Sequence, residues 1–515
     1  MKPYFKSIEK ELQEPMEENQ VEDVDVTNMM RTYIIILFSL LSLSAWAQES
    51  DSTSHYKKRV LDATEIDLLF SYYEQDGNNS AVSGGVGNEH LTDVTPTIIV
   101  SMPAGPDGVL TIDAGISAYS SASSSNINPF NSTGASQGGR YEDDDDDDDD
   151  DEGYGTGTGT PIGSPWVASS GASKSDALTS LNVSYAHSSD DRNNIWNMNG
   201  SISREYDYSS FGFGGGFAKL MNQKNTELSF KAQVYLDQWN PIYPTELHEY
   251  ETYGQEFLSS GFFSGVTVYD QQGVASTSYL PSAFSAVQDK KRNSYALSVG
   301  FSQILSRNFQ ISLFVDAIRQ EGLLSTPYQR VYFADVENYF IGDTQQISVY
   351  ESKQNTGVYQ LADDVERLPS TRLKIPIGVR ANYYLTEFLS LRTYYRYYQD
   401  DWGLTAHTAS IELPIKIGSR FTFYPNYRYY EQNQADYFAP FDTHLSTEQY
   451  YTSDYDLSTF DSQTLGMGIS YKDIFTSMKI GNIGLKSIDV RYQNYQRSNG
   501  LNANIVSFAF KFVVD

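Results

Sequence analysis

The sequence predicts an all-β fold: a single transmembrane antiparallel β-barrel of about sixteen strands with short periplasmic turns and long extracellular loops. Three observations predict it. They are an export-type hydrophobic segment near the start, repeated segments of alternating apolar and polar residues, and connections that are short at one end and mostly long at the other. The mean hydropathy of −0.45 argues against a bundle of membrane helices, each of which needs about 20 apolar residues.

A signal peptide is predicted over residues 1–47. Arg31 precedes an apolar run over 33–43, and residues 45–47 (Ala-Trp-Ala) form a small-x-small cleavage site. The competing interpretation is a signal anchor, which the shortness of the run disfavours.

The stretch before Arg31 is acidic, and a translation start at Met29 or Met30 would give an ordinary signal peptide. Residues 48–63 are expected to form a short periplasmic segment, with no plug domain before the first strand. The chain has no cysteine, which excludes disulfides, thiol catalysis and thiolate metal sites.

Membrane strands are predicted from side-chain alternation with a period of two. In 226–239, for example, Leu228, Phe230 and Ala232 alternate with Ser229 and Lys231. Segments of this kind are 64–74, 93–102, 108–120, 177–188, 195–206, 208–219, 226–239, 293–305, 309–320, 371–385, 389–399, 403–417, 420–432, 460–472, 483–496 and 501–513. We therefore assign 64–515 to the barrel.

The connections support this assignment. If the first strand runs outward, the periplasmic connections are all short, and 473–482 is the longest of them. The long connections are all extracellular: 75–92, 121–176, 240–292, 321–370 and 433–459. This segregation is typical of outer-membrane barrels.

The alternative fold is a soluble β-sandwich or β-helix, whose strands also alternate but pack against a second layer. In this sequence, aromatic side chains gather at the ends of the predicted strands, which favours the aromatic girdles of a membrane barrel over a soluble fold. They are Tyr72, Tyr73, Tyr235, Trp239, Tyr394, Tyr395, Tyr397, Tyr398, Trp402, Tyr427, Tyr429 and Tyr430, and His407 is expected to join them on the lipid side.

Several motifs recur in one order along the chain. They are Glu205-Tyr206-Asp207-Tyr208 with the glycine-rich 211–217, 225–229, Leu324 to Val331, Tyr395 to Leu404 with His407-Thr408, and Tyr427 to Tyr430 with Ala435 to Phe438. In this the chain resembles the domain of unknown function 3570 family of Gram-negative outer-membrane β-barrel proteins. The resemblance implies a transmembrane barrel in the outer membrane of a Gram-negative bacterium, and no established reaction or ligand. The poly-aspartate loop and the terminal 513–515 depart from the family pattern.

Charged residues are predicted to line the lumen asymmetrically. By strand parity the acidic set comes from the first nine strands and the basic set from the last seven: Asp67, Asp113, Glu227, Asp237 and Asp316, against Arg380, Arg392, Arg396, Arg428 and Arg491. Lys231, Glu412 and Asp489 are exceptions. Opposed charges would create a transverse field in an aqueous pore. The alternative, to which we give equal weight, is a closed interior filled by ion pairs.

Loop 121–176 contains a run of carboxylates between Glu142 and Glu152. Its central members are Asp143, Asp144, Asp145, Asp146, Asp147, Asp148, Asp149, Asp150 and Asp151. Mutual repulsion predicts a solvated tract. Such a tract would attract calcium or other divalent cations only weakly, because the glycine-punctuated calcium loop is missing.

No catalytic constellation stands out, so we expect no enzyme and no cofactor. The six histidines are scattered, and Asp400-Asp401 is read as a polar turn rather than a catalytic pair. The glycines at 212 and 214–216 are expected to leave a bare patch of wall that a loop or ligand could approach. The net charge of −30 argues against nucleic acid as a partner.

Three functional hypotheses follow, with outer-membrane lipid as the surrounding partner in each. The first is a pore for small solutes with a charge-asymmetric lumen. The second is a non-conducting scaffold whose outer loops bind a partner or surface polysaccharide. The third, less favoured, is an outer-membrane enzyme.

Overall fold

The computed structural model describes residues 59–123, 175–205, 207–263, 265–351 and 357–514. The expected signal peptide over 1–47 and the acidic run over 142–152 lie outside these residues. Within the described ranges, no helix is long and apolar enough to cross a membrane.

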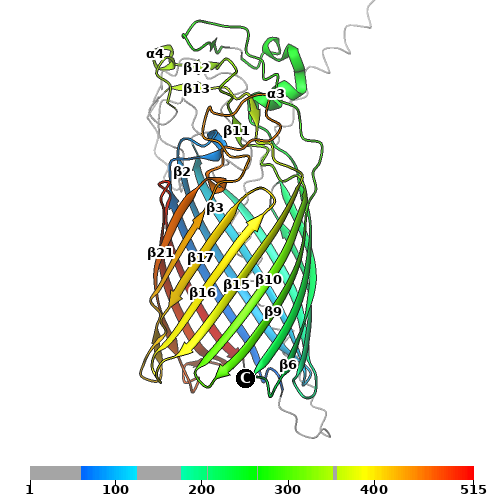
Figure 1. The fold of residues 1–515 in the computed structure, drawn as a ribbon, viewed down its shortest axis with the longest axis vertical. Helices are drawn as coiled ribbons and strands as arrows, with labels where there is room; N and C mark the ends of the chain where they lie inside the picture. Colours follow the sequence, from blue (N-terminus) through cyan, green and yellow to red (C-terminus); the bar gives the residue numbers. More distant parts are fainter. Residues whose placement is uncertain (1–58, 124–174, 206, 264, 352–356, 515) are drawn as a thin grey trace, which may run out of the picture. The chain divides into compact units, whose positions relative to one another are not determined.

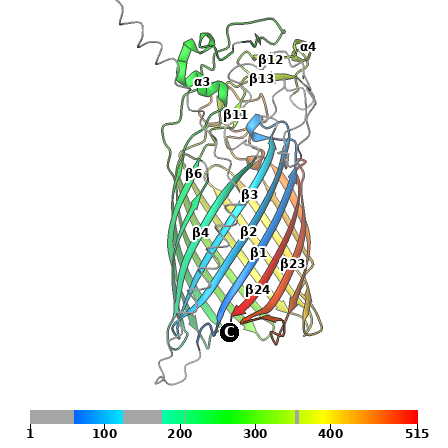
Figure 2. The same cartoon turned by 180° about the vertical axis from the view of Figure 1, so that it is seen from behind.

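An antiparallel sheet of 19 strand segments forms the wall of a barrel (Figures 1 and 2). Its segments are β1 (Thr64–Asp76), β2 (Glu89–Ala104), β3 (Gly108–Ser123), β4 (Ser175–Ser188), β5 (Asn194–Arg204), β6 (Tyr208–Met221), β7 (Thr226–Trp239), β9 (Arg292–Ser306), β10 (Phe309–Gly322), β15 (Thr371–Tyr384), β16 (Ser390–Asp400), β17 (Thr405–Glu412), β18 (Ile415–Ile417), β19 (Phe421–Phe423), β20 (Asn426–Gln432), β21 (Phe460–Lys472), β22 (Lys479–Ile480), β23 (Ile483–Arg497) and β24 (Asn502–Val514).

These segments make sixteen wall strands, because β18 continues β17, β20 continues β19, and β22 is a short arm before β23. The predicted strand count is confirmed. The segments predicted over 403–417 and 420–432 are each interrupted, at Pro414 and Pro425. Proline has no backbone N–H to donate to the sheet.

The barrel closes where β1 pairs with β24. The register runs from Thr64 opposite Val514 to Asp76 opposite Asn502, without a break. Closure leaves no open sheet edge in the membrane, where an unpaired backbone group costs several kcal/mol.

The outer face of the wall is apolar. Large side chains such as Ile202, Leu297 and Leu465 are 57%, 63% and 67% exposed, which suits contact with lipid. The opposite face is the interior, as one contact demonstrates. Arg491 on β23 reaches Glu412 on β17 at 3.4 Å although two wall strands lie between them, so both side chains point to the concave side.

All long described connections lie at one end of the barrel, together with a few short turns. The other end has only short connections and carries the C-terminal end of β24 (Figures 1 and 2). The barrel is therefore an outer-membrane protein with periplasmic turns and extracellular loops, as predicted.

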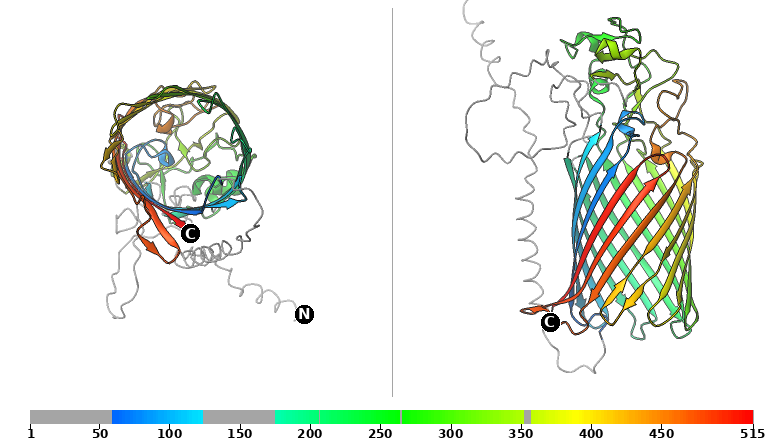
Figure 3. Two further views of the ribbon diagram at one scale, coloured as in Figure 1. Left: turned by 90° about the horizontal axis from the view of Figure 1, so that it is seen from below. Right: turned by 90° about the vertical axis from the view of Figure 1, so that its left-hand side faces the viewer.

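The extracellular loops are folded rather than irregular. They contain η2 (Ala81–Ser83), α3 (Thr245–Tyr253), η5 (Gly254–Ser259), β8 (Val268–Tyr269), β11 (Arg330–Val331), β12 (Phe340–Gly342), α4 (Thr344–Ile347), β13 (Val358–Gln360), β14 (Asp364–Val365) and η6 (Tyr455–Leu457). We call the described residues of 77–88, 240–291, 323–370 and 433–459 the outer cap. In the end-on view of Figure 3, segments of the outer cap lie within the circle formed by the barrel wall.

Hydrophobic clusters hold the outer cap together. Phe257 and Tyr279 from one long loop pack with Ile341 and Leu361 from another, and all four are at most 1% exposed. A second cluster joins Leu247 and Tyr332 in the same way. The two loops therefore share a core and form one folded body.

Candidate functional site

The strand registers place all ten charged residues predicted for the lumen on one face of the wall. Two rows illustrate this on the basic side. Asn382, Arg392 and Glu412 lie opposite one another on β15, β16 and β17. The next row consists of Arg380, Tyr394, Ser410 and Arg428. On the acidic side, Asp67 and Asp113 both lie opposite Ile99 of β2. This face is the interior that Glu412 and Arg491 define.

The arginines of the interior differ in their partners. Glu412 accepts from Arg392 at 2.7 Å and from Arg491 at 3.4 Å. Among the described residues, no carboxylate lies within 4.0 Å of the guanidinium groups of Arg380, Arg396 and Arg428. Each of these three instead lies over a tyrosine ring, at 5.6, 5.7 and 5.9 Å.

The acidic residues of the interior fall into two groups. At the seam, Lys511 lies 3.0 Å from Glu65 and 3.4 Å from Asp67, so charges of opposite sign neutralise one another there. Asp113 on β3 lies eight strands from Arg396 on β16 in either direction around the ring. The two charges therefore occupy opposite walls. Both alternatives considered for the lumen thus have a place: ion pairs lie at the seam and around Glu412, and separated charges lie elsewhere.

A cavity of about 420 Å³ opens on the basic wall of the interior. It is lined by Arg380, Asn382, Arg392, Thr393, Tyr394, Ser410 and Glu412. The Arg392 side chain is 52% exposed, which is the behaviour of a solvated group rather than of a packed core. We call this cavity the arginine pocket.

An aromatic pair borders the arginine pocket. The rings of Phe314 and Tyr394 stack at 5.8 Å with an interplanar angle of 12°. The tip of the Phe314 ring also lies over Gly378, where an added Cβ would come within 2.0 Å of its Cζ. Phe314 and Tyr394 were not expected at the site. Phe314 could have been predicted from the sequence, because it is a phenylalanine at a polar-face position opposite a glycine, Gly378, in the next strand.

The aromatic girdle is smaller than predicted. Tyr395, Tyr397 and His407 lie together on the outer face, where the Tyr395 hydroxyl is 2.8 Å from Nδ1 of His407. The girdle assignment is wrong for residues of the opposite parity, which face the interior or its rim: Tyr73, Tyr235, Trp239, Tyr394, Tyr398, Trp402 and Tyr430. Adjacent residues of a strand point to opposite faces, so a run of rings cannot all meet lipid.

The expected bare patch over the glycines of β6 is also wrong. The Tyr235 ring and the Gln233 amide lie over Gly212 and Gly214, so close that an added Cβ would collide with them. Gly215 belongs to the other face. Gly212, Gly214 and Gly216 make room for side chains of β5 and β7.

A buried ion pair joins the loops of the outer cap. Nε of Arg330 donates to Oε1 of Glu246 at 2.8 Å, and both side chains are 0% exposed. Nη1 of Arg330 also points at the carbonyl of Val82, 3.5 Å away. The Glu246 carboxylate holds the pKa of Arg330 above its ordinary value, against the opposing effect of burial. Three separate loops therefore meet at one guanidinium.

Buried carboxylates flank β14, the strand that pairs with the strand of Arg330. Glu366 accepts from the backbone N–H of Thr326 at 2.7 Å and from the Thr452 hydroxyl. Burial raises the pKa of Glu366 to about 7, against the opposing effect of the hydrogen bonds from Thr452 and Thr326. Burial likewise raises the pKa of Asp363 to about 7. The described residues include no group of three or more acidic or histidine side chains arranged to hold a metal ion.

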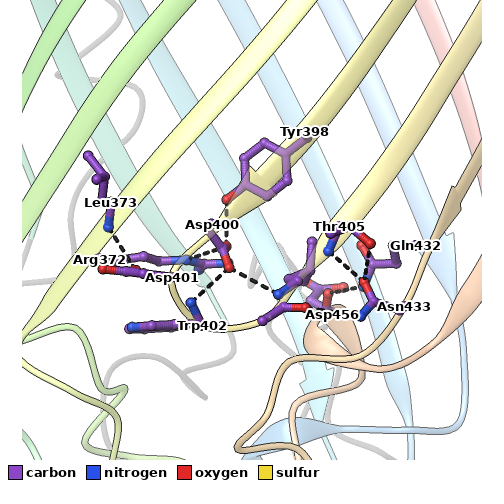
Figure 4. Close-up of polar contacts among 12 residues, drawn as sticks. Arg372, Leu373, Tyr398, Asp400, Asp401, Trp402, Thr405, Gln432, Asn433 and Asp456 are labelled. Carbon is purple, nitrogen blue, oxygen red and sulfur yellow. Dashed lines mark hydrogen bonds and ion pairs between the residues drawn. The ribbon is translucent and has the colours of Figure 1, made fainter.

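The paired carboxylates Asp400 and Asp401 serve a turn (Figure 4). Asp400 accepts from Arg372, from the Tyr398 hydroxyl at 2.7 Å, and from the backbone N–H groups of Trp402 and Leu404 at 3.0 and 3.1 Å. Asp401 accepts from the N–H of Leu373 at 2.8 Å. Both oxygens of Asp400 thus accept from donors of the chain itself, and the side chain organises the turn.

Comparison with solved structures found distant similarities to outer-membrane proteins. A solved "Bacterial polysaccharide outer membrane secretin" is 8% identical, with 88% of this chain and 100% of that chain covered and a TM-score of 0.39. The "TodX monoaromatic hydrocarbon channel deltaS2 mutant" is 8% identical, with 88% and 91% covered and a TM-score of 0.35. Pseudomonas aeruginosa OccK2 (OpdF) in complex with glucuronate is 8% identical, with 89% and 99% covered and a TM-score of 0.34. Likenesses this distant support no inference about function.

No curated protein matches the chain. A family profile described as "Protein of unknown function (DUF3570)" matches residues 38–505. This range takes in nearly the whole barrel and outer cap, including the Tyr395 to Leu404 motif whose turn Asp400 organises. The chain belongs to the DUF3570 family of proteins of unknown function.

Proposed function

We propose that this protein is an outer-membrane pore for small solutes. The observation that carries the proposal is the basic wall: Arg380, Arg396 and Arg428 face the interior without a carboxylate partner among the described residues, and Arg380 and Arg428 are exposed there. In a packed barrel interior such charges would be paired, because an unpaired buried charge is costly. A water-filled lumen provides their solvation instead.

The proposed pore is charge-asymmetric. Asp113 and the arginines of β15 and β16 occupy opposite walls, and a narrow aqueous space with low-dielectric walls strengthens the field between them. Such a field favours small charged or dipolar solutes over apolar ones. The outer cap lies at the extracellular mouth and would control entry.

Conductance in planar lipid bilayers tests the proposal. The purified protein should give stepwise openings, and replacing Arg380 and Arg396 with Gln should shift the reversal potential in a potassium chloride gradient towards that of a more cation-selective pore. Arg319→Gln is the matched control. Arg319 lies on β10, the strand next to β15, but its side chain is 62% exposed on the outer face of the wall. A folded protein that never conducts would overturn the proposal.

A second candidate is a scaffold that binds a partner through the outer cap. The shared hydrophobic core of the cap favours it, because loops that only border a pore need no core of their own. The same bilayer measurement separates the two candidates: a silent, folded barrel supports the scaffold.

A further inference from the structure

We infer that the arginine pocket binds a small hydroxylated monocarboxylate on its way through the barrel. The inference rests on the proposed pore, and it adds the chemical class of the solute. The pocket is built from two cross-strand rows, Asn382–Arg392–Glu412 and Arg380–Tyr394–Ser410. Residues two apart on a strand are about 7 Å apart, so the rows bracket one small molecule.

The guanidinium groups indicate a carboxylate ligand. Glu412 is itself a carboxylate held by two arginines, Arg392 and Arg491, which shows that this wall accommodates the group. Arg380 lies in the next row with no described carboxylate near it, and its guanidinium lies over the Tyr394 ring. A guanidinium presents two parallel N–H donors that match a carboxylate. Arg380 is therefore the anchor for an incoming carboxylate.

The formal charge of the pocket favours a monoanion. Arg380 and Arg392 supply two positive charges and Glu412 one negative charge, so the lining carries one net positive charge. One carboxylate neutralises it. A dianion would be repelled by Glu412 at short range in a space where charges are screened less than in bulk water.

The neutral lining residues indicate hydroxyl groups on the ligand. The Asn382 amide can donate and accept hydrogen bonds, and so can the hydroxyls of Tyr394 and Ser410. No large aliphatic side chain lines the pocket. A hydroxylated chain would replace the hydrogen bonds that these groups make to water, whereas an alkyl chain would displace the water and leave the groups without partners. The volume of about 420 Å³ lies within the range of small-molecule sites.

Calorimetric titration of the detergent-solubilised protein measures this binding without requiring conduction. Gluconate is the probe, hexanoate is the carboxylate without hydroxyls, and sulfate is the dianion. We expect gluconate to bind more tightly than either. We also expect Arg380→Gln to weaken gluconate about 10-fold or more, the loss of a charge-assisted hydrogen bond. Arg380→Lys keeps the charge but not the paired donors, so its gluconate affinity should lie between those of the unchanged protein and Arg380→Gln.

Lys231→Gln is the matched control for lumen charge. Lys231 faces the interior from β7, outside the pocket, and its loss should leave gluconate affinity within about twofold. Circular dichroism and heat-modifiable migration establish that each variant is folded. Equal binding of hexanoate or sulfate, or equal weakening by the Lys231 and Arg380 variants, would overturn the inference.

The two proposals fail differently. A barrel that conducts but does not bind gluconate removes the inference and leaves the pore. A barrel that binds gluconate through Arg380 but never conducts removes the pore, and with it the claim that the ligand passes through. In a working pore, gluconate should also reduce chloride current, and this reduction should be weaker in Arg380→Gln.

Discussion

The guanidinium of Arg372 donates twice to one carboxylate oxygen of Asp400 and lies 4.2 Å from the centre of the Trp402 ring. The Asp400 side chain is 0% exposed and that of Arg372 is 13% exposed. Trp402 donates in turn from Nε1 to the carbonyl of Thr371 at 2.9 Å. This group ties the outer ends of β15 and β16 to the turn that leads into β17.

Asp400→Asn should therefore destabilise the barrel. It leaves Arg372 without its partner and replaces an acceptor with an amide that cannot accept from all the same donors, at a cost of about 3 kcal/mol. Thermal unfolding in detergent, followed by circular dichroism, measures the loss. Asp401→Asn is the matched control and should cost less than about 1 kcal/mol, because one backbone donor remains satisfied by the amide oxygen. Equal effects would contradict this account of the turn.

Glu246→Gln should loosen the outer cap without opening the barrel wall. The change leaves the Arg330 charge fully buried and unpaired, which typically costs about 3–5 kcal/mol. Limited proteolysis should then cleave the cap at least about tenfold faster, while the barrel strands stay intact. Glu251→Gln, an exposed change on the same helix α3, should leave the rate unchanged. Cleavage within the strands would refute a local effect.

The outer cap should lose stability as the pH rises. Burial raises the pKa of Glu366 from its ordinary value of 4.5 to about 7, so the folded cap holds a proton that the unfolded loop has released. The stability that protonated Glu366 contributes therefore falls between about pH 4.5 and 7 and is constant above that range. Amide exchange near Thr326 and Thr452, corrected for intrinsic rates, should be faster at pH 8 than at pH 5.5.

Glu366→Gln is the test of this assignment. A neutral amide keeps the hydrogen-bonding shape but cannot ionise, so the pH dependence of exchange should shrink. It should not vanish, because burial raises the pKa of Asp363 in the same direction. Slower exchange at pH 8 than at pH 5.5 in the natural protein would reverse the sign and reject the prediction.

Gly378→Ala should narrow the pore. The new methyl group would occupy the space of the Phe314 ring and push it towards the lumen. We expect single-channel conductance to fall and stability to drop by about 1–3 kcal/mol, the usual cost of overpacking. Gly200→Ala is the control: an added Cβ there has only one neighbour, at 3.9 Å, and conductance should not change. An unchanged conductance in Gly378→Ala would show that Phe314 does not border the path.

The strands could be predicted because a barrel wall imposes one rule along its whole length. Each strand must present apolar residues to lipid and polar residues to the interior, so the alternation is written into the sequence, as in Leu228 to Leu236. The same parity placed Arg380 and Asp113 on a common face. Small irregularities such as the break at Pro414 interrupt the wall without changing parity.

The outer cap and the arginine pocket could not be predicted in the same way. Arg330 and Glu246 are 84 residues apart and neither lies in a periodic segment, so nothing in the sequence pairs them. Glu412 was read only as an acidic exception on the basic wall. Its role depends on Arg491, which two intervening strands and the curvature of the wall bring to it. Contacts across a curved interior leave no local pattern.

The pairing of Thr64 with Val514 has a consequence for biogenesis. β1 and β24 are the two ends of the barrel sequence, so β1 carries an unpaired edge until every other strand has been delivered to the periplasm. During that interval the edge is open to wrong pairing and aggregation, and the apolar side chains of the outer face are exposed to water. Closure therefore depends on the last strand: a chain interrupted before β24 keeps an open edge at β1, whose unpaired backbone groups would be costly in lipid.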